Sequence, residues 1–286
     1  MAGPPRTYRR RMSSPTSPAG PQLSLGHALA LGALHGPAEL LPISSSGHIT
    51  LIPWLLEWRY SELDSELRKS FEVALHAGTA AALLITLRDE VADTLVGMSL
   101  HRLAFIALSF APPAAVGYTL ERPIERRLGT PLTIAAGLMA GSVVMALSDR
   151  KPQSRTTEEA TLADALWLGA AQACALIPGV SRNGATLAAA RLRRFTRADA
   201  NRLSRHVALP VIAGATVLKT VRLRRRGLPP GAALPFAAGA TASFASTLGS
   251  TWLIRQVERD RSLLPYALYR VALASLVLAR MSRSGG

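Results

Sequence analysis

The sequence is poor in cysteine, aromatic residues and negative charge. A single cysteine, Cys174, stands in 286 residues, which excludes an intramolecular disulfide framework and a cysteine-based zinc site. Aromatic residues make up 5% of the chain, and 18 Asp and Glu face 33 Lys and Arg. The basic balance excludes an acidic solvating protein, and the apolar content of 49% excludes a largely disordered chain.

Lysine is also scarce, so the positive charge is nearly all arginine. The arginines fall in short runs beside apolar stretches, at residues 9–11, 191–197 and 222–226. Runs of this kind suit contact with anionic lipid headgroups. Nucleic-acid binders usually interleave basic residues with aromatics or carry a recognisable module, and this chain does neither. The charge pattern therefore favours a membrane over a nucleic acid as the partner.

Uncharged stretches recur along the chain after a polar start. They cover residues 25–38, 73–87, 103–120, 131–148, 165–181, 207–218, 231–254 and, with one arginine, 263–278. A membrane-spanning helix needs about 20 mostly apolar residues. Several stretches reach that length, while the shorter ones at 25–38 and 165–181 fit re-entrant helices. We therefore predict an all-α, polytopic integral membrane protein.

The first residues differ from the rest in composition. Residues 1–22 are rich in Pro, Ser and Arg, which predicts a disordered basic tail. They carry positive charge but no apolar segment at signal-peptide distance, so we expect no cleaved signal. The remaining chain, residues 23–286, is predicted to form a single membrane-embedded domain.

A short internal repeat links the two halves of the chain. The segment 40–45 resembles the segment 176–181 at a constant spacing, which places Pro42 over Pro178 and Ser45 over Ser181. Each copy ends a short apolar stretch at a proline and leads into a turn rich in Ser and Gly. Paired interrupted segments indicate a site between inverted repeats. We predict repeat halves of about 23–148 and 161–286, each with a re-entrant helix pair.

The first candidate site runs from His35 to His48. His35 and Glu39 share one face if the segment is helical. A charged carboxylate at the bilayer centre costs roughly 2.5–3.5 kcal/mol, so chains keep one where it pairs, binds an ion or takes part in chemistry. The alternative is a Glu at a helix end that reaches the interface. The following turn, residues 44–47, offers hydroxyls and N–H groups to phosphate oxygens, and His48 can transfer protons.

The second candidate site runs from Pro178 to Thr186. Arg182 offers a planar fork of donors that fits phosphate. The alternative for Arg182 is snorkelling to lipid headgroups, which suits the basic run at 191–197 better. Gly179 and Gly184 let the backbone approach an anion closely.

These two segments resemble the signature motifs of the undecaprenyl-diphosphatase family, the bacitracin-resistance membrane phosphatases. The first motif is a Glu or Gln, three residues, a Glu and a Leu-Pro-x-Ser-Ser-x-Gly-His tail, which residues 39–48 match. The second, Pro-Gly-x-Ser-Arg-Ser-x-x-Thr, is matched by residues 178–186. Weaker similarity covers residues 71–79 and 208–215, and the order agrees over nearly the whole chain after residue 22.

The resemblance implies hydrolysis of undecaprenyl diphosphate to undecaprenyl phosphate, which recycles the lipid carrier of cell-wall synthesis. In this interpretation Glu39 is the general base and Arg182 neutralises charge in the transition state. Ser45 is the preferred nucleophile, with His48 as its proton partner or the leaving-group acid. Direct attack by water stays open beside it. The remaining residues expected to contact phosphate are Ser44, Ser46, Gly47, Gly179, Ser181, Asn183 and Thr186.

Two residues depart from the family pattern. Asn183 stands in place of a Ser and keeps hydrogen-bonding ability. His35 stands where the family has Glu or Gln. The resemblance implies a divalent cation, Mg²⁺ or Ca²⁺, with Glu39 and His35 as ligands. Because hard cations prefer oxygen ligands, His35 shifts the expected preference toward Mn²⁺ or another ion that tolerates imidazole.

A lipid transporter is the main rival function, since inverted repeats with broken helices also build the midplane sites of transporters. The membrane acid phosphatases are a second rival, but they have a histidine six residues after the arginine of a Ser-Arg pair, where this chain has Ala188. The expected partners are a polyprenyl diphosphate lipid and the bilayer, with a homodimer as an option and no nucleic acid. By resemblance, the site opens to the outer face of a bacterial cytoplasmic membrane, although the charge distribution does not fix the orientation.

Overall fold

The computed structural model describes residues 22–228, 230–259 and 262–284, and every regular element in these ranges is a helix. This confirms the all-α prediction. The elements in chain order are α1 (Leu25–Leu40), α2 (Ser45–Leu55), η1 (Arg59–Glu62), α3 (Ser65–Thr86), α4 (Arg88–Val96), α5 (Leu100–Leu128), α6 (Pro131–Asp149), η2 (Thr157–Glu159), α7 (Leu162–Cys174), α8 (Arg182–Leu192), α9 (Arg197–Arg226), α10 (Ala233–Gly249), α11 (Trp252–Arg259) and α12 (Leu264–Ser284). The predicted tail, residues 1–22, lies outside the described residues except for Gln22, so its disorder stays a prediction.

Three of the described helices are long and apolar enough to cross a membrane: α5, α6 and the part of α12 from Leu264 to Arg283. Large apolar side chains such as Leu103, Val143 and Leu276 stand exposed on them, as a lipid surround requires. The uncharged stretch 231–254 does not form one span, because α10 ends at Gly249 and α11 follows as a separate short helix.

Helix α5 continues through three prolines. Pro112, Pro113 and Pro123 all lie inside it. A proline has no N–H, so the carbonyl four residues before it loses its helical partner. For Pro113 that carbonyl belongs to Ser109, and the Gln172 side chain of α7 donates to it at 3.2 Å. A neighbouring helix thus satisfies the group that the proline leaves open, as is usual in membrane helices.

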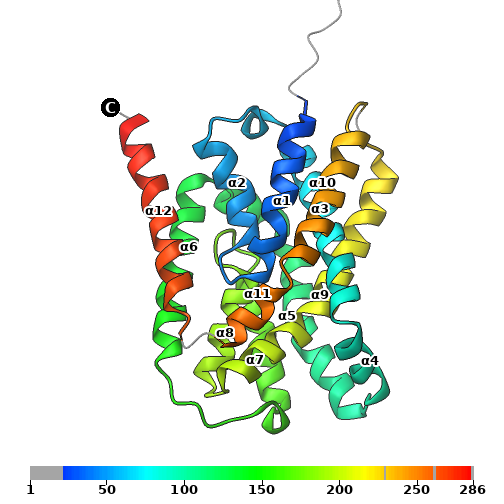
Figure 1. The fold of residues 1–286 in the computed structure, drawn as a ribbon, viewed down its shortest axis with the longest axis vertical. Helices are drawn as coiled ribbons and strands as arrows, with labels where there is room; N and C mark the ends of the chain where they lie inside the picture. Colours follow the sequence, from blue (N-terminus) through cyan, green and yellow to red (C-terminus); the bar gives the residue numbers. More distant parts are fainter. Residues whose placement is uncertain (1–21, 229, 260–261, 285–286) are drawn as a thin grey trace, which may run out of the picture.

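The α1–α2 and α7–α8 pairs reach the middle of the molecule from opposite faces (Figure 1). Helix α12 links the two faces. At its start, the Leu263 N–H donates to Asp149, whose backbone carbonyl also accepts from Arg191 near the end of α8. At its other end, Arg280 donates to the carbonyl of Leu55, the last residue of α2. Helices α2 and α8 therefore end at opposite faces and run antiparallel. The division of the chain into two whole repeats stays a prediction.

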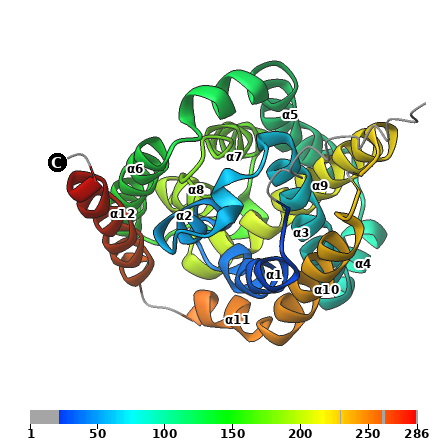
Figure 2. The ribbon, with the colours of Figure 1, turned by 90° about the horizontal axis from the view of Figure 1, so that it is seen from above.

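Seen from above, α2 and α8 lie near the centre, surrounded by α5, α6, α9, α10 and α12 (Figure 2). Helix α1 is held beside them by close packing on α10. A Cβ atom added at Gly32 would lie 2.4 Å from the Gly239 carbonyl, and one added at Gly36 would lie 2.3 Å from Ser246 Oγ. Small residues let helix backbones approach in a membrane, where apolar burial drives association little. This packing fixes α1 and its last turn, which carries Glu39.

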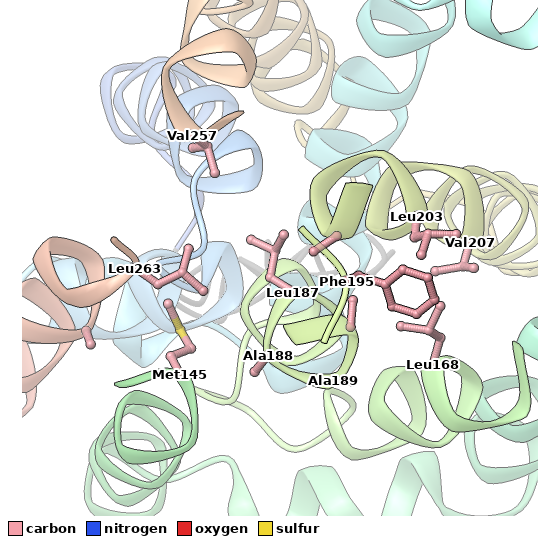
Figure 3. Packing of buried hydrophobic residues seen from close by; sticks show 13 residues of the cluster. Met145, Leu168, Leu187, Ala188, Ala189, Phe195, Leu203, Val207, Val257 and Leu263 are labelled. Carbon is pink, nitrogen blue, oxygen red and sulfur yellow. The ribbon is translucent and has the colours of Figure 1, made fainter. Parts of the chain in front are cut away.

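A buried apolar cluster holds helix α8 in place (Figure 3). Its larger members are Met145, Leu168, Leu187, Phe195, Leu203, Val207, Val257 and Leu263. They come from α6, α7, α8, α9, α11 and the segments that join them. The central helix α8 therefore packs in one cluster with residues of α6, α7, α9 and α11 and with the residue just before α12.

Candidate active site

The site forms where two similar turns face each other, and each turn ends in a serine that caps the next helix. Ser44 has φ 77° and Ser181 has φ 71°, a region that residues with a Cβ seldom adopt. Ser44 Oγ accepts from the Gly47 N–H at 3.3 Å, and Ser181 Oγ accepts from the Gly184 N–H at 3.2 Å. Matching strain and matching caps make Ser44 the counterpart of Ser181. The predicted alignment of Ser45 with Ser181 is therefore wrong by one residue, because the second turn has one residue more between its proline and its capping serine.

Glu39 joins the two motifs. Its Oε2 accepts a hydrogen bond from Ser45 Oγ at 2.5 Å, and its Oε1 accepts one from Arg182 Nη2 at 2.5 Å. The Glu39 side chain is only 7% exposed, so its charge is desolvated and depends on these partners. The structure thus brings together the predicted base, the predicted nucleophile and the predicted phosphate-binding cation around one carboxylate.

A cavity of about 410 Å³ opens onto this carboxylate. Its volume falls within the usual range for small-molecule sites. Its polar lining includes Glu39, Ser44, Ser45, Ser46, Ser181, Arg182 and Asn183. Its walls include the apolar side chains of Val73, Ile124, Ile134, Val211 and Ile212, and charged groups of both signs, with Arg68, Lys69 and Arg126 beside Glu72, Glu121 and Glu125. The apolar walls can accept an apolar chain, and Arg182 and the serine hydroxyls can bind an anionic head.

Four of the residues predicted to take part in catalysis or phosphate binding, Gly47, His48, Gly179 and Thr186, are not part of this lining. His48 is 1% exposed. Its Nδ1 lies 2.7 Å from the Ser44 carbonyl, which can only accept, so Nδ1 carries the proton. Its Nε2 then accepts from the Tyr269 hydroxyl at 2.7 Å. Both ring nitrogens are engaged in holding the turn. The proton transfer expected of His48 stays a prediction.

Asn183 and Thr186 hold α8 in place. Asn183 Nδ2 donates to the Leu40 carbonyl at 2.9 Å, which satisfies a group that the end of α1 leaves open. Asn183 Oδ1 accepts from Ser204 Oγ at 3.1 Å. The buried Thr186 hydroxyl donates to the Arg182 carbonyl at 2.9 Å and lies 2.5 Å from Ser204 Oγ. Asn183 thus ties the start of α8 to the end of α1, which keeps Arg182 beside Glu39.

Arg270 is a residue of the site that the motifs did not reveal. Its fully buried guanidinium lies between the two turns and donates to carbonyls of both. It bonds the Pro42 carbonyl of the first turn at 3.3 Å, and the carbonyls of Gly179 and Val180 in the second at 3.0 and 2.9 Å. The signal in the sequence was its position as the one charge within the apolar stretch 263–278.

His76 of α3 also reaches the site and was not among the predicted site residues. Its Nδ1 lies 3.9 Å from Glu39 Oε2, and its ring meets the His35 ring edge-on at 4.5 Å between centroids. One ligand atom from each of His35, Glu39 and His76 falls within 4.8 Å of the others. This set of two imidazoles and one carboxylate does not fit Mg²⁺ or Ca²⁺, which take oxygen ligands. A histidine within the uncharged stretch 73–87 was the available signal.

Comparison with known proteins shows the family of the chain. The model of a family described as bacitracin resistance protein BacA matches residues 28–276. The chain belongs to this family. A protein named undecaprenyl-diphosphatase from Geobacter sulfurreducens is 41% identical over 271 residues, which cover 90% of this chain and 98% of the relative. Proteins of the same name from Pelobacter propionicus and Trichlorobacter lovleyi are 37% identical over 278 residues and 38% identical over 270 residues, covering 91% and 90% of this chain and 100% and 97% of their own lengths.

Proposed function

We propose that this protein hydrolyses undecaprenyl diphosphate to undecaprenyl phosphate and inorganic phosphate within a membrane. The observation that carries this proposal is Glu39, held between the Ser45 hydroxyl and the Arg182 guanidinium in the lining of a cavity that also has apolar walls. A hydroxyl bonded to a carboxylate is the arrangement of an activated nucleophile. An adjacent guanidinium is suited to the phosphate under attack. The membrane helices and the relatives of the family agree with a lipid substrate.

In the first step Ser45 Oγ attacks the terminal phosphorus and Glu39 takes its proton. The bond from that phosphorus to the bridging oxygen breaks, and its electron pair leaves with undecaprenyl phosphate. In the second step water attacks the phosphoserine, the proton held by Glu39 returns to Ser45 Oγ, and inorganic phosphate is released. Direct attack of a water activated by Glu39 is the alternative route, with Ser45 then binding phosphate.

Charge on the transferring phosphoryl group is stabilised by fixed donors. Arg182 supplies a positive charge, and α2 and α8 both begin beside the cavity. The first N–H groups of a helix have no helical acceptor and carry partial positive charge, so both helix starts favour the phosphate oxygens. Preorganised donors of this kind commonly supply the largest share of catalysis in phosphoryl transfer.

The resemblance implies Mg²⁺ or Ca²⁺ as cofactor, but the ligands around Glu39 do not suit these ions, and we assign no step to either. Ser44, Ser46, Ser181 and Asn183 line the cavity and remain proposed phosphate contacts. Gly179 acts through its backbone, since its carbonyl accepts from Arg270.

For location, we propose the bacterial cytoplasmic membrane. A homodimer and the absence of a nucleic-acid partner stay predictions. The transporter alternative is not favoured, because the relatives carry the name of a phosphatase.

The test is release of inorganic phosphate from undecaprenyl diphosphate by purified protein in detergent. Glu39→Gln removes the base and Arg182→Ala removes the cation, so each should lower the rate by at least about a hundredfold. Glu62→Gln is the matched control, because Glu62 is an exposed carboxylate in η1. A wild type that folds, binds the lipid and releases no phosphate would contradict the proposal and favour lipid transport.

A further inference from the structure

We propose that His35, Glu39 and His76 form a site for a borderline transition-metal dication of the Zn²⁺, Mn²⁺ or Co²⁺ class. The inference deepens the proposed function, on which it rests for its catalytic meaning, by naming the ion class of the same site. Two imidazole nitrogens and one carboxylate oxygen are ligands typical of such ions. One ligand atom from each residue lies within 4.8 Å of the other two.

The hydrogen bonds around His35 leave one nitrogen ready to bind a cation. Ser243 Oγ donates its proton to the Leu75 carbonyl, and Thr247 Oγ1 donates its proton to the Ser243 carbonyl. The 2.8 Å contact between the Thr79 and Ser243 hydroxyls then needs the proton of Thr79. Thr79 Oγ1 can therefore only accept from His35 Nδ1, which lies 2.9 Å away. Nδ1 carries the proton, and the lone pair of His35 is on Nε2.

That lone pair is buried without a partner. His35 is 1% exposed, and its Nε2 makes no hydrogen bond within the described part of the chain. An unsatisfied buried polar atom is costly, and native structures rarely keep one without a reason. Because Nδ1 is fixed by Thr79, the ring cannot turn Nε2 elsewhere without losing that bond. Metal-binding histidines commonly donate their other ring N–H to a fixed acceptor, as His35 Nδ1 does to Thr79 Oγ1.

Glu39 and His76 supply the other ligands and face the substrate cavity. Both line it, and Glu39 Oε2 is the oxygen that lies 3.9 Å from His76 Nδ1. A cation here would leave coordination positions open toward the cavity, as catalytic metal sites do. It would add positive charge near Glu39 Oε2, whereas Arg182 bonds Oε1. With His35 in place of the family's Glu or Gln, the site therefore still binds a cation, but it prefers a different class of ion.

The test is cobalt binding by the full-length protein, purified in detergent without a histidine tag and stripped of metal with a chelator. Co²⁺ bound by nitrogen and oxygen ligands absorbs visible light, which reports binding without any turnover. We expect one Co²⁺ per chain, displaced by Zn²⁺ and not by a large excess of Mg²⁺. His35→Gln and His76→Gln should each weaken binding by at least about tenfold. His101→Gln, which alters an exposed histidine at the start of α5, should leave binding unchanged.

A gain-of-function variant sharpens the test. His35→Glu replaces a nitrogen with oxygen ligands, so Mg²⁺ should now compete with Co²⁺. Absence of the visible bands, or bands that neither His35→Gln nor His76→Gln alters, would overturn the inference. Phosphate release measured on the same samples separates the two proposals: turnover without Co²⁺ binding contradicts the metal site alone, and Co²⁺ binding without turnover contradicts the phosphatase alone.

Discussion

The α1–α2 and α7–α8 turns share one backbone design and divide the chemistry between them. In both, a serine with positive φ caps a helix whose first residue faces the cavity. When Ser44 is aligned with Ser181, Ser45 falls on Arg182. The same position thus carries the proposed nucleophile in one turn and the phosphate-binding cation in the other. Because the two helices run in opposite directions, their positive ends meet at one point, which neither pair could achieve alone.

The pairs differ in how their first helix is anchored. Helix α1 is held along its length by glycines packed against α10. Helix α7 is held at its start by charge: Thr161 and Asp164 form a capping box, and Arg155 and Arg193 both bond the Asp164 carboxylate. Glycine packing anchors α1 without using any charged side chain. The Glu39 carboxylate at the end of α1 is therefore left to pair with Arg182. The ionic anchor lies at the molecular face, away from the reacting groups.

The largest effect should come from removing the Ser45 hydroxyl, the proposed nucleophile of the first turn. Ser45→Ala should lower phosphate release by at least about a thousandfold, because the nucleophile and its base act as one unit. A phosphoenzyme trapped from the wild type by acid quench should disappear in this variant. Ser61→Ala, in η1, is the matched control. Near-normal turnover by Ser45→Ala would assign the attack to water.

The next effect concerns the residue that joins the turns. Arg270→Met keeps an unbranched side chain but leaves the Pro42, Gly179 and Val180 carbonyls without their donor. We expect kcat to fall about 10- to 100-fold as the two turns lose their alignment, with KM changed less. Arg270→Lys should recover part of kcat, since Lys also donates. Arg283→Met, an exposed arginine of the same helix, is the control, and equal losses in both variants would contradict a specific role.

The sequence predicts those residues of the site that lie within the two motifs, and it does not predict those that come from other helices. Glu39, Ser45 and Arg182 stand in motifs whose residue types suit phosphate chemistry, and the structure brings them together. Arg270 and His76 come from helices distant in sequence, so only packing reveals their contacts. Spacing along a chain does not show which way a ring points, so the contacts of the His48 ring with Ser44 and Tyr269 also came only from the structure. The alignment error had a similar cause, since matching prolines hid an extra residue in the second turn.

A smaller effect should follow from weakening the ionic anchor of α7. Asp164→Asn removes the charge that Arg155 and Arg193 share, at a cost of about 2 kcal/mol in unfolding free energy, since both arginines are partly exposed. Burial alone would raise the pKa of Asp164, but hydrogen bonds from Arg155, the Thr161 backbone and Arg193 hold it below its usual range. A carboxyl with a lowered pKa stabilises the fold above its unfolded pKa of about 4 and loses this contribution as pH falls through the folded pKa. Unfolding in mixed micelles should therefore show a gap between wild type and variant that is constant from pH 7 to about pH 5 and narrows below about pH 4. A gap independent of pH would refute the charge as its cause.

The smallest effect tests the symmetry of the two turns directly. Ser44→Ala and Ser181→Ala each remove one capping hydrogen bond and keep a Cβ at positive φ, so each should lower the unfolding free energy by about 1 kcal/mol. Ser44→Gly and Ser181→Gly lose the same cap but relieve the backbone strain, so each should cost less than the matching alanine variant. The difference in unfolding free energy between the alanine and glycine variants at each site measures the backbone strain, because both variants lack the cap. Equal differences at both sites, measured by unfolding in mixed micelles, would mean that the turns store the same strain. A glycine that costs as much as alanine at one site alone would show that only the other turn is strained, and the shared backbone design would then be limited to the cap.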